Sequence, residues 1–223
     1  MRPSLSVEIW SDVVCPWCYI GKRRWETAAA LLHDEVELNV VFRPFQLDPT
    51  ASPGTSTPVI EAYAKKFGGA ERAQQLIDNV TATAAGEGLQ FRMDIALRAN
   101  TLLAHRLLWV AEATGHQYAL KERLMRAYFC DGVDIGDIET LADCAHDVGM
   151  AREQVVAFLH SDDGTAEVQA LFREASEAGI TAVPTFVVDG RWMVPGAQDA
   201  ETFVSVVRRV IAQTNETRVA AND

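Results

Sequence analysis

Residues 7–18, Val-Glu-Ile-Trp-Ser-Asp-Val-Val-Cys-Pro-Trp-Cys, decide the fold of this chain. The first four alternate as in a β-strand, and a helix-like segment from Gly21 to Leu32 follows the second cysteine. A Cys-x-x-Cys motif between a strand and a helix is typical of a redox-active pair. The spacing places the first sulfur at the helix start and the second one turn further on, within reach of an unstrained disulfide.

The order of the two cysteines predicts their chemistry. Free N–H groups and the helix dipole favour a thiolate at Cys15, which makes it the expected attacking group, and Cys18 the resolving thiol. Pro16 and Trp17 lie between them and are expected to tune the relative energies of disulfide and dithiol. Packing is the simpler role for both.

Two other uses of the motif are less consistent with the sequence. A zinc site needs further ligands, yet Cys130 and Cys144 are fourteen positions apart and the five histidines form no metal-binding pattern. A structural disulfide closing so short a loop would stabilise little. We therefore expect no metal, and we expect Cys130 and Cys144 to be small buried side chains, with a second redox pair as the alternative.

Composition limits the possible partners. The chain has 223 residues, of which 48% are hydrophobic, and a formal net charge of -11. That charge disfavours nucleic acid, and no apolar run approaches the ~20 residues of a membrane span. The N-terminal residues lack the apolar core of a signal peptide, and cysteine is scarce, so a soluble cytoplasmic protein is expected.

The order of predicted elements divides the chain into three parts. Residues 1–57 read as strand, helix and strand, and residues 161–213 read as a helix, a hairpin turning at Asp189-Gly190, and a final helix over 200–213. Residues 58–160 between them show only helical periodicity. We expect an α/β thioredoxin fold in two pieces, interrupted by an inserted all-helical subdomain, with 214–223 as a flexible tail.

A second segment is predicted to complete the site. Val183-Pro184-Thr185 opens the first hairpin strand, and proline is unusual at the entry to a strand bound for the sheet centre. A cis bond before Pro184 is therefore expected. It would leave the backbone beside the cysteines free to pair with an extended substrate.

These features together resemble the DsbA family of thioredoxin-fold oxidoreductases, over most of the chain from Val7 to about Ile211. The resemblance implies that Cys15 is the nucleophile, Cys18 the resolving thiol and Pro184 the cis-proline. Several further motifs resemble the FrnE-like branch of that family: Pro44-Phe45-Gln46-Leu47-Asp48-Pro49, Asn100-Thr101, Ala104-His105-Arg106 and Leu120-Lys121-Glu122-Arg123-Leu124.

Other polar residues are weaker candidates. Asn100 and His105 belong to the FrnE-like pattern and are candidates for the substrate cleft, although Asn100 could cap a helix and His105 could be a core or surface residue. Glu8 is a candidate proton acceptor for Cys18 if its strand face is buried, and an outward side chain if not.

The leading hypothesis is a thiol:disulfide oxidoreductase that exchanges disulfides of proteins or small molecules through a mixed disulfide. It needs no cofactor, and glutathione is a candidate redox partner or co-substrate. One alternative, from the same fold neighbourhood, is a glutathione-dependent isomerase or transferase similar to 2-hydroxychromene-2-carboxylate isomerase and kappa-class glutathione transferases. Another is a chaperone that binds peptides beside Pro184.

Overall fold

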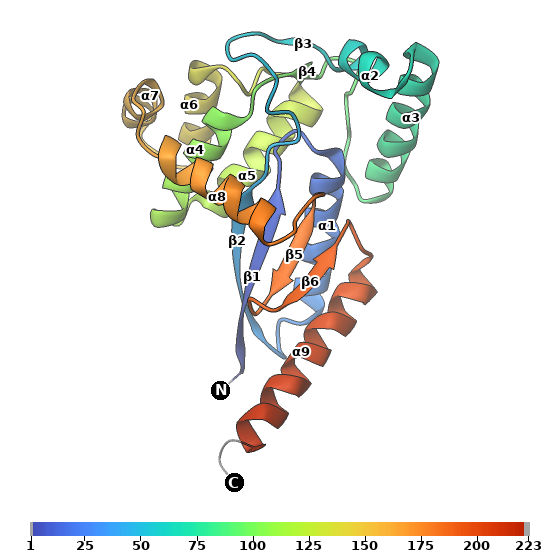
Figure 1. Cartoon of the computed structure of the whole chain (residues 1–223), viewed down its shortest axis with the longest axis vertical. Helices are drawn as coiled ribbons and strands as arrows, with labels where there is room; N and C mark the ends of the chain where they lie inside the picture. Colours follow the sequence, from blue (N-terminus) through green and yellow to red (C-terminus); the bar gives the residue numbers. More distant parts are fainter. Residues whose placement is uncertain (1, 221–223) are drawn as a thin grey trace.

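A four-stranded sheet forms the centre of the molecule in the computed structural model, which describes residues 2–220 and the side chains of 2–214. The strand order is β2-β1-β5-β6, with β1 parallel to β2 and antiparallel to β5 (Figure 1). The two pieces of the α/β unit therefore share one sheet, as the sequence predicted. The strands are β1 (Ser4–Ser11), β2 (Glu37–Pro44), β5 (Thr185–Val188) and β6 (Trp192–Pro195).

The two faces of the sheet have separate cores. Alternate residues of β1, such as Val7 and Ile9, pack with α1 (Pro16–Leu31) and α9 (Ala200–Ala220). On the opposite face Trp10 packs with Ala175 of α8 (Thr165–Glu177). This alternation fixes the register of β1, and therefore the direction in which the motif leaves the sheet.

The helical insertion lies over the end of the sheet where β1 leads into α1 (Figure 1). Its fourth helix, α5 (Gln117–Arg126), packs against β2, and α3 (Ala70–Gly86) packs against α1. The insertion therefore contacts both β2 and α1, and its apolar residues share one core cluster with Cys15 and Cys18. Its elements are α2 (Val59–Phe67), α3 (Ala70–Gly86), α4 (Leu102–Ala113), α5 (Gln117–Arg126), the π-helical turn η1 (Ala127–Asp131), α6 (Ile138–Asp147) and α7 (Arg152–His160).

The insertion is not entirely helical, which corrects the sequence prediction. Two short strands, β3 (Thr57–Pro58) and β4 (Leu97–Arg98), pair in antiparallel fashion within it. The amide of Val59 extends this pairing by donating to the carbonyl of Ala96 over 2.9 Å. Two residues are too few to produce an alternating pattern, so these strands could not be predicted from hydrophobic periodicity.

Near the C-terminus one prediction is confirmed and one boundary differs. Asp189 and Gly190 both have positive φ, 53° and 64°, as a two-residue hairpin turn requires. Helix α9 continues to Ala220, beyond the predicted end at residue 213. The segment 214–220 contains neither glycine nor proline, so nothing local stops the helix. Residues 221–223 of the predicted tail lie outside the described residues.

Candidate active site

The two cysteines of the motif occupy the first turn of α1, as predicted. Cys15 is the N-cap residue, Pro16 begins the helix, and the amide of Cys18 donates to the Cys15 carbonyl over 3.0 Å. Cys15 and Cys18 are 3% and 2% exposed, whereas Trp17 between them is 40% exposed. The site therefore presents an aromatic side chain to solvent and keeps both sulfurs within the protein.

The Val183-Pro184 segment lies against the first cysteine. The Cys15 thiol donates a hydrogen bond to the Val183 carbonyl over 3.7 Å, and the peptide bond between Val183 and Pro184 is cis, as predicted. Thr185 holds the segment by donating from Oγ1 to the Ala182 carbonyl over 2.8 Å. The Pro184 carbonyl accepts from Gly196. The fold thus unites the two halves of the predicted site.

Close contact between α1 and this segment requires a glycine at position 21. A Cβ atom there would lie 3.0 Å from Cγ of Pro184 and 3.3 Å from Cβ of Ala197. Such distances are shorter than ordinary carbon contacts. Gly21, one turn beyond the motif, therefore sets how closely α1 approaches Pro184.

Burial gives the second cysteine the character of a protonated thiol. The pKa of Cys18 is raised well above its usual value, first by burial and then by its hydrogen bond with Cys15. Lys121 opposes this shift through its positive charge. At neutral pH the Cys18 sulfur is therefore a thiol that holds its proton strongly.

Asp12 connects the motif to the rest of the site. Its buried carboxylate accepts the Leu47 amide over 2.8 Å and contacts Nε2 of His105 over 3.1 Å. Its carbonyl accepts from the Cys15 amide over 3.3 Å. Asp12 therefore links the motif turn to the loop after β2 and to α4. The sequence identified His105 as a candidate; the structure places it in the interior beside Asp12.

Asn100 lies in a different set of contacts. Its Nδ2 donates to the Ala51 carbonyl over 2.7 Å, and its Oδ1 accepts the Leu102 amide over 2.9 Å at the start of α4. Oδ1 also accepts from Gln46. These bonds join the loop after β2 to the helical insertion. The N-cap of α4 is Thr101, so Asn100 lies one residue before the cap predicted for it, although its side chain accepts from the first amide of the helix.

Glu8 does not face Cys18, so its proposed role as a buried proton acceptor is wrong. Its carboxylate pairs with Arg43 of the neighbouring strand over 2.8 Å and is 28% exposed. The adjacent Ile9, which points to the other side of β1, is the buried residue. Strand alternation thus places an apolar side chain where the acid was expected.

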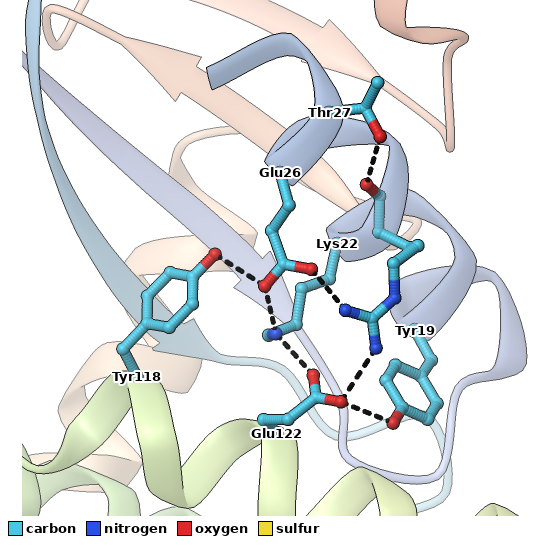
Figure 2. Close-up of polar contacts among 7 residues, drawn as sticks. Tyr19, Lys22, Glu26, Thr27, Tyr118 and Glu122 are labelled. Atoms are coloured by element: carbon cyan, nitrogen blue, oxygen red, sulfur yellow. Dashed lines mark hydrogen bonds and ion pairs between the residues drawn. The ribbon is translucent and has the colours of Figure 1, made fainter. Parts of the chain in front are cut away.

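A network of charged residues ties α1 to α5 (Figure 2). Lys22, 1% exposed, contacts Glu26 over 2.6 Å and also Glu122 of α5. Glu122 accepts from Tyr19 over 2.7 Å and from Arg23 over 2.8 Å. The basic residues that follow the motif are therefore paired with carboxylates and hold the insertion against the active-site helix.

Two residues near the cysteines were given no role in the site by the sequence analysis, which noted Lys121 only within the FrnE-like motif at 120–124 and did not mention Tyr63. Tyr63 of α2 interacts electrostatically with Cys15, and burial raises the pKa of its phenol to about 12. Lys121 of α5 is buried beside Cys18 and Cys15. Both come from the insertion, and neither forms a motif with the cysteines, so only the tertiary structure reveals them.

The remaining cysteines lie elsewhere in the insertion. Cys130 is partly buried and Cys144 is buried, and both are free thiols. Burial raises the pKa of each. Among the side chains of residues 2–214, no three histidine, cysteine or acidic groups lie close enough together to hold a metal ion. Within residues 2–220, no helix is both long and apolar enough to cross a bilayer.

The chain is similar to known proteins in both sequence and structure. Residues 6–208 match the family model described as a DSBA-like thioredoxin domain. A solved structure of a probable DsbA oxidoreductase from Streptomyces coelicolor is 38% identical, with a TM-score of 0.86 over 93% of this chain and 90% of that one. The uncharacterized Bacillus subtilis protein YwbO is 28% identical over 92% of this chain and 96% of its own length.

A more distant structure is that of the cytosolic disulfide reductase DsbM from Pseudomonas aeruginosa with GSH. It is 17% identical and has a TM-score of 0.63, covering 95% of this chain and 99% of its own. At this level of identity the likeness concerns the fold.

Proposed function

Because this chain belongs to the DSBA-like thioredoxin domain family, we propose that it is a thiol:disulfide oxidoreductase whose redox centre is Cys15 and Cys18. The single observation that carries the proposal is the position of the Cys15 sulfur against the Val183 carbonyl, at the start of α1. A substrate chain that paired with the backbone at Val183 would bring its own disulfide to Cys15.

The proposed reaction has two exchange steps. The Cys15 thiolate attacks one sulfur of a substrate disulfide, forming the Cys15–substrate bond while the first substrate thiolate leaves. The Cys18 thiolate then attacks the Cys15 sulfur, so the Cys15–Cys18 disulfide forms and the second substrate thiolate leaves. Each leaving thiolate takes up a proton. The substrate is reduced by two electrons and the motif is oxidised; the reverse sequence oxidises a dithiol.

Several residues are assigned supporting roles in this proposal. Pro16 fixes the helix start beside Cys15 and Trp17 offers an exposed apolar contact to the substrate. Val183, Pro184 and Thr185 form the docking segment. Asn100 and His105 act at a distance, by holding the loop after β2 and the Asp12 turn.

Glutathione is the proposed small-molecule partner. The solved structure of DsbM with GSH shares this fold, although its low identity carries no residue-level argument. We also propose a cytoplasmic site of action, because Cys130 and Cys144 are free thiols outside the motif and such cysteines are typical of reducing compartments.

Trapping the mixed disulfide tests the proposal. A Cys18→Ser variant incubated with oxidised glutathione should accumulate a glutathione adduct on Cys15, because the resolving thiol is absent. The wild-type protein should release that glutathione and form an internal disulfide. Intact mass and peptide mapping distinguish the two products.

Two variants serve as controls for this experiment. Cys15→Ser should form no adduct in the motif, and Cys130→Ser should behave as wild type. Retention of exchange activity by Cys15→Ser would contradict the proposal. Glutathione-dependent turnover of a small molecule that survives loss of Cys18 would instead indicate an isomerase or transferase.

A further inference from the structure

A lysine without a hydrogen-bond partner lies in the interior beside the redox centre. Lys121 is 1% exposed, and its ammonium has no hydrogen-bond partner among the described residues. Its Nζ atom lies 5.5 Å from the centre of the Phe42 ring. An isolated buried charge is costly, so this environment favours the neutral amine of Lys121, which can accept a proton.

The position of Lys121 is fixed by its own helix. One turn earlier, the Gln117 side chain accepts from the Phe42 amide over 2.8 Å and donates to the Phe42 carbonyl over 3.0 Å. Residues four apart share one face of a helix, so this anchor directs Lys121 across the same strand toward the motif. The neighbouring Glu122 forms an ion pair with Lys22 of α1, which holds α5 against the active-site helix.

The groups that face the Lys121 ammonium come from the motif and its flanks. Cys18, Asp12 and Cys15 act on it as potential anions, and Lys22 acts as a second cation. Among the groups nearby, His105 of α4 contacts Asp12, while Tyr128 of η1 interacts with Asp12 and Cys15. Asp12 already accepts two hydrogen bonds, and Cys18 is the strongest electrostatic partner of Lys121.

We propose that Lys121 is the proton acceptor for Cys18 in the resolving step, so that the helical insertion supplies a group that the sheet lacks. This inference rests on the proposed oxidoreductase function. The only acid in the body of β1, Glu8, pairs with Arg43, which leaves Cys18 without a carboxylate from that strand.

The proton balance of the step is simple. The neutral amine of Lys121 takes the proton of the Cys18 thiol, giving an ammonium and a thiolate. The thiolate attacks the Cys15 sulfur, the Cys15–Cys18 bond forms, and the substrate thiolate leaves and is protonated by solvent. Lys121 then releases its proton to solvent. Burial lowers the pKa of Lys121 to about 8, so a fraction of the neutral amine is present at neutral pH.

Reaction with 5,5′-dithiobis(2-nitrobenzoate) separates the two steps. In a Cys130→Ser/Cys144→Ser background, the first thionitrobenzoate is released when Cys15 attacks, and the second when Cys18 resolves the adduct. A Cys18→Ser variant should show only the first phase and therefore identifies which phase belongs to which cysteine. Lys121→Met should lower the ratio of second-phase to first-phase rate on the order of 100-fold at pH 7, as loss of a proton acceptor does.

The pH dependence of the second-phase rate would not change if Lys121 had only a structural role. The wild-type second phase should rise through an inflection near pH 8, the value for Lys121, and Lys121→Met should lose that inflection and rise only at higher pH. Lys66→Met changes an exposed lysine in the same way and should leave both phases unchanged.

Stability measurements and a second variant distinguish loss of the proton acceptor from a folding defect. Lys121→Met should unfold at the same temperature as wild type or higher, because an apolar group replaces a buried amine that has no hydrogen-bond partner. Lys121→Gln provides a second neutral side chain. An unchanged rate ratio and an unchanged inflection in either folded variant would overturn the inference. Absence of the first phase in the wild type would instead overturn the proposed function.

Discussion

The sulfur of Cys15 lies 3.7 Å from the carbonyl oxygen of Val183, a residue 168 positions further along the chain. This contact joins the first strand-helix unit to the C-terminal hairpin, and the whole helical insertion lies between them in sequence. The insertion in turn contributes Tyr63 and Lys121 to the surroundings of the cysteines. The redox centre is thus assembled from three separate parts of the chain.

Gly21 should be required for the close packing of α1 on Pro184. Gly21→Ala would place a methyl group 3.0 Å from the proline ring, so we expect loss of about 1–2 kcal/mol of stability from overpacking, and slower exchange because the Cys15–Val183 contact is disturbed. Urea unfolding and the rate of glutathione exchange measure the two effects.

Gly86→Ala is the matched control for this variant. Gly86 also lies in a helix, and a Cβ atom there would meet nothing within 4 Å. We expect it to gain about 0.5 kcal/mol through the higher helix propensity of alanine. Equal stabilisation by both substitutions would show that the contact at Gly21 is unimportant.

Glu122 should make stability depend on pH in the acid range. Burial alone would raise its pKa, but hydrogen bonds and charges from Lys22, Tyr19 and Arg23 outweigh it and hold the pKa below the usual value (Figure 2). A carboxylate with a lowered folded-state pKa stabilises the fold above its unfolded pKa, and this contribution is lost as the pH falls through the folded value.

Glu122→Gln should therefore show a shallower loss of stability than wild type as the pH falls from about 5 toward 3. Urea unfolding midpoints over this range provide the measurement. Glu174→Gln removes the same charge from an exposed position on α8 and should keep the wild-type slope. Identical slopes for wild type and Glu122→Gln would contradict the assigned role of the network.

Cys130 and Cys144 should take no part in the exchange reaction. Burial raises the pKa of both thiols, which lowers the fraction of reactive thiolate at neutral pH. We expect the double variant Cys130→Ser/Cys144→Ser to retain wild-type exchange kinetics. Peptide mapping after mild oxidation should find no bond between them; such a bond would establish a second redox pair.

The local structure of the motif was predictable from sequence. The position of Cys15 and Cys18 between a strand and a helix could be predicted, because the strand pattern before them and the helix pattern after them are both short-range signals. The Asp189-Gly190 turn and the cis bond before Pro184 were likewise predicted from residue types with strong backbone preferences.

The groups around the cysteines were not predictable in the same way. Glu8 and Ile9 differ by one position, and sequence alternation alone did not say which would be buried. Lys121 was noted only as part of the FrnE-like motif at 120–124, and its burial depends on how α5 packs on β2 through Gln117. Such long-range packing leaves no periodic signal in the chain.

The most direct test of the account is the equilibrium between the dithiol and disulfide forms of the motif across glutathione buffers. Alkylation of the remaining thiols and intact mass would report the two forms, with Cys15→Ser as the control. The account predicts one reversible two-electron transition that joins Cys15 to Cys18 and is absent from the control. Failure to form an internal disulfide in any buffer would contradict it.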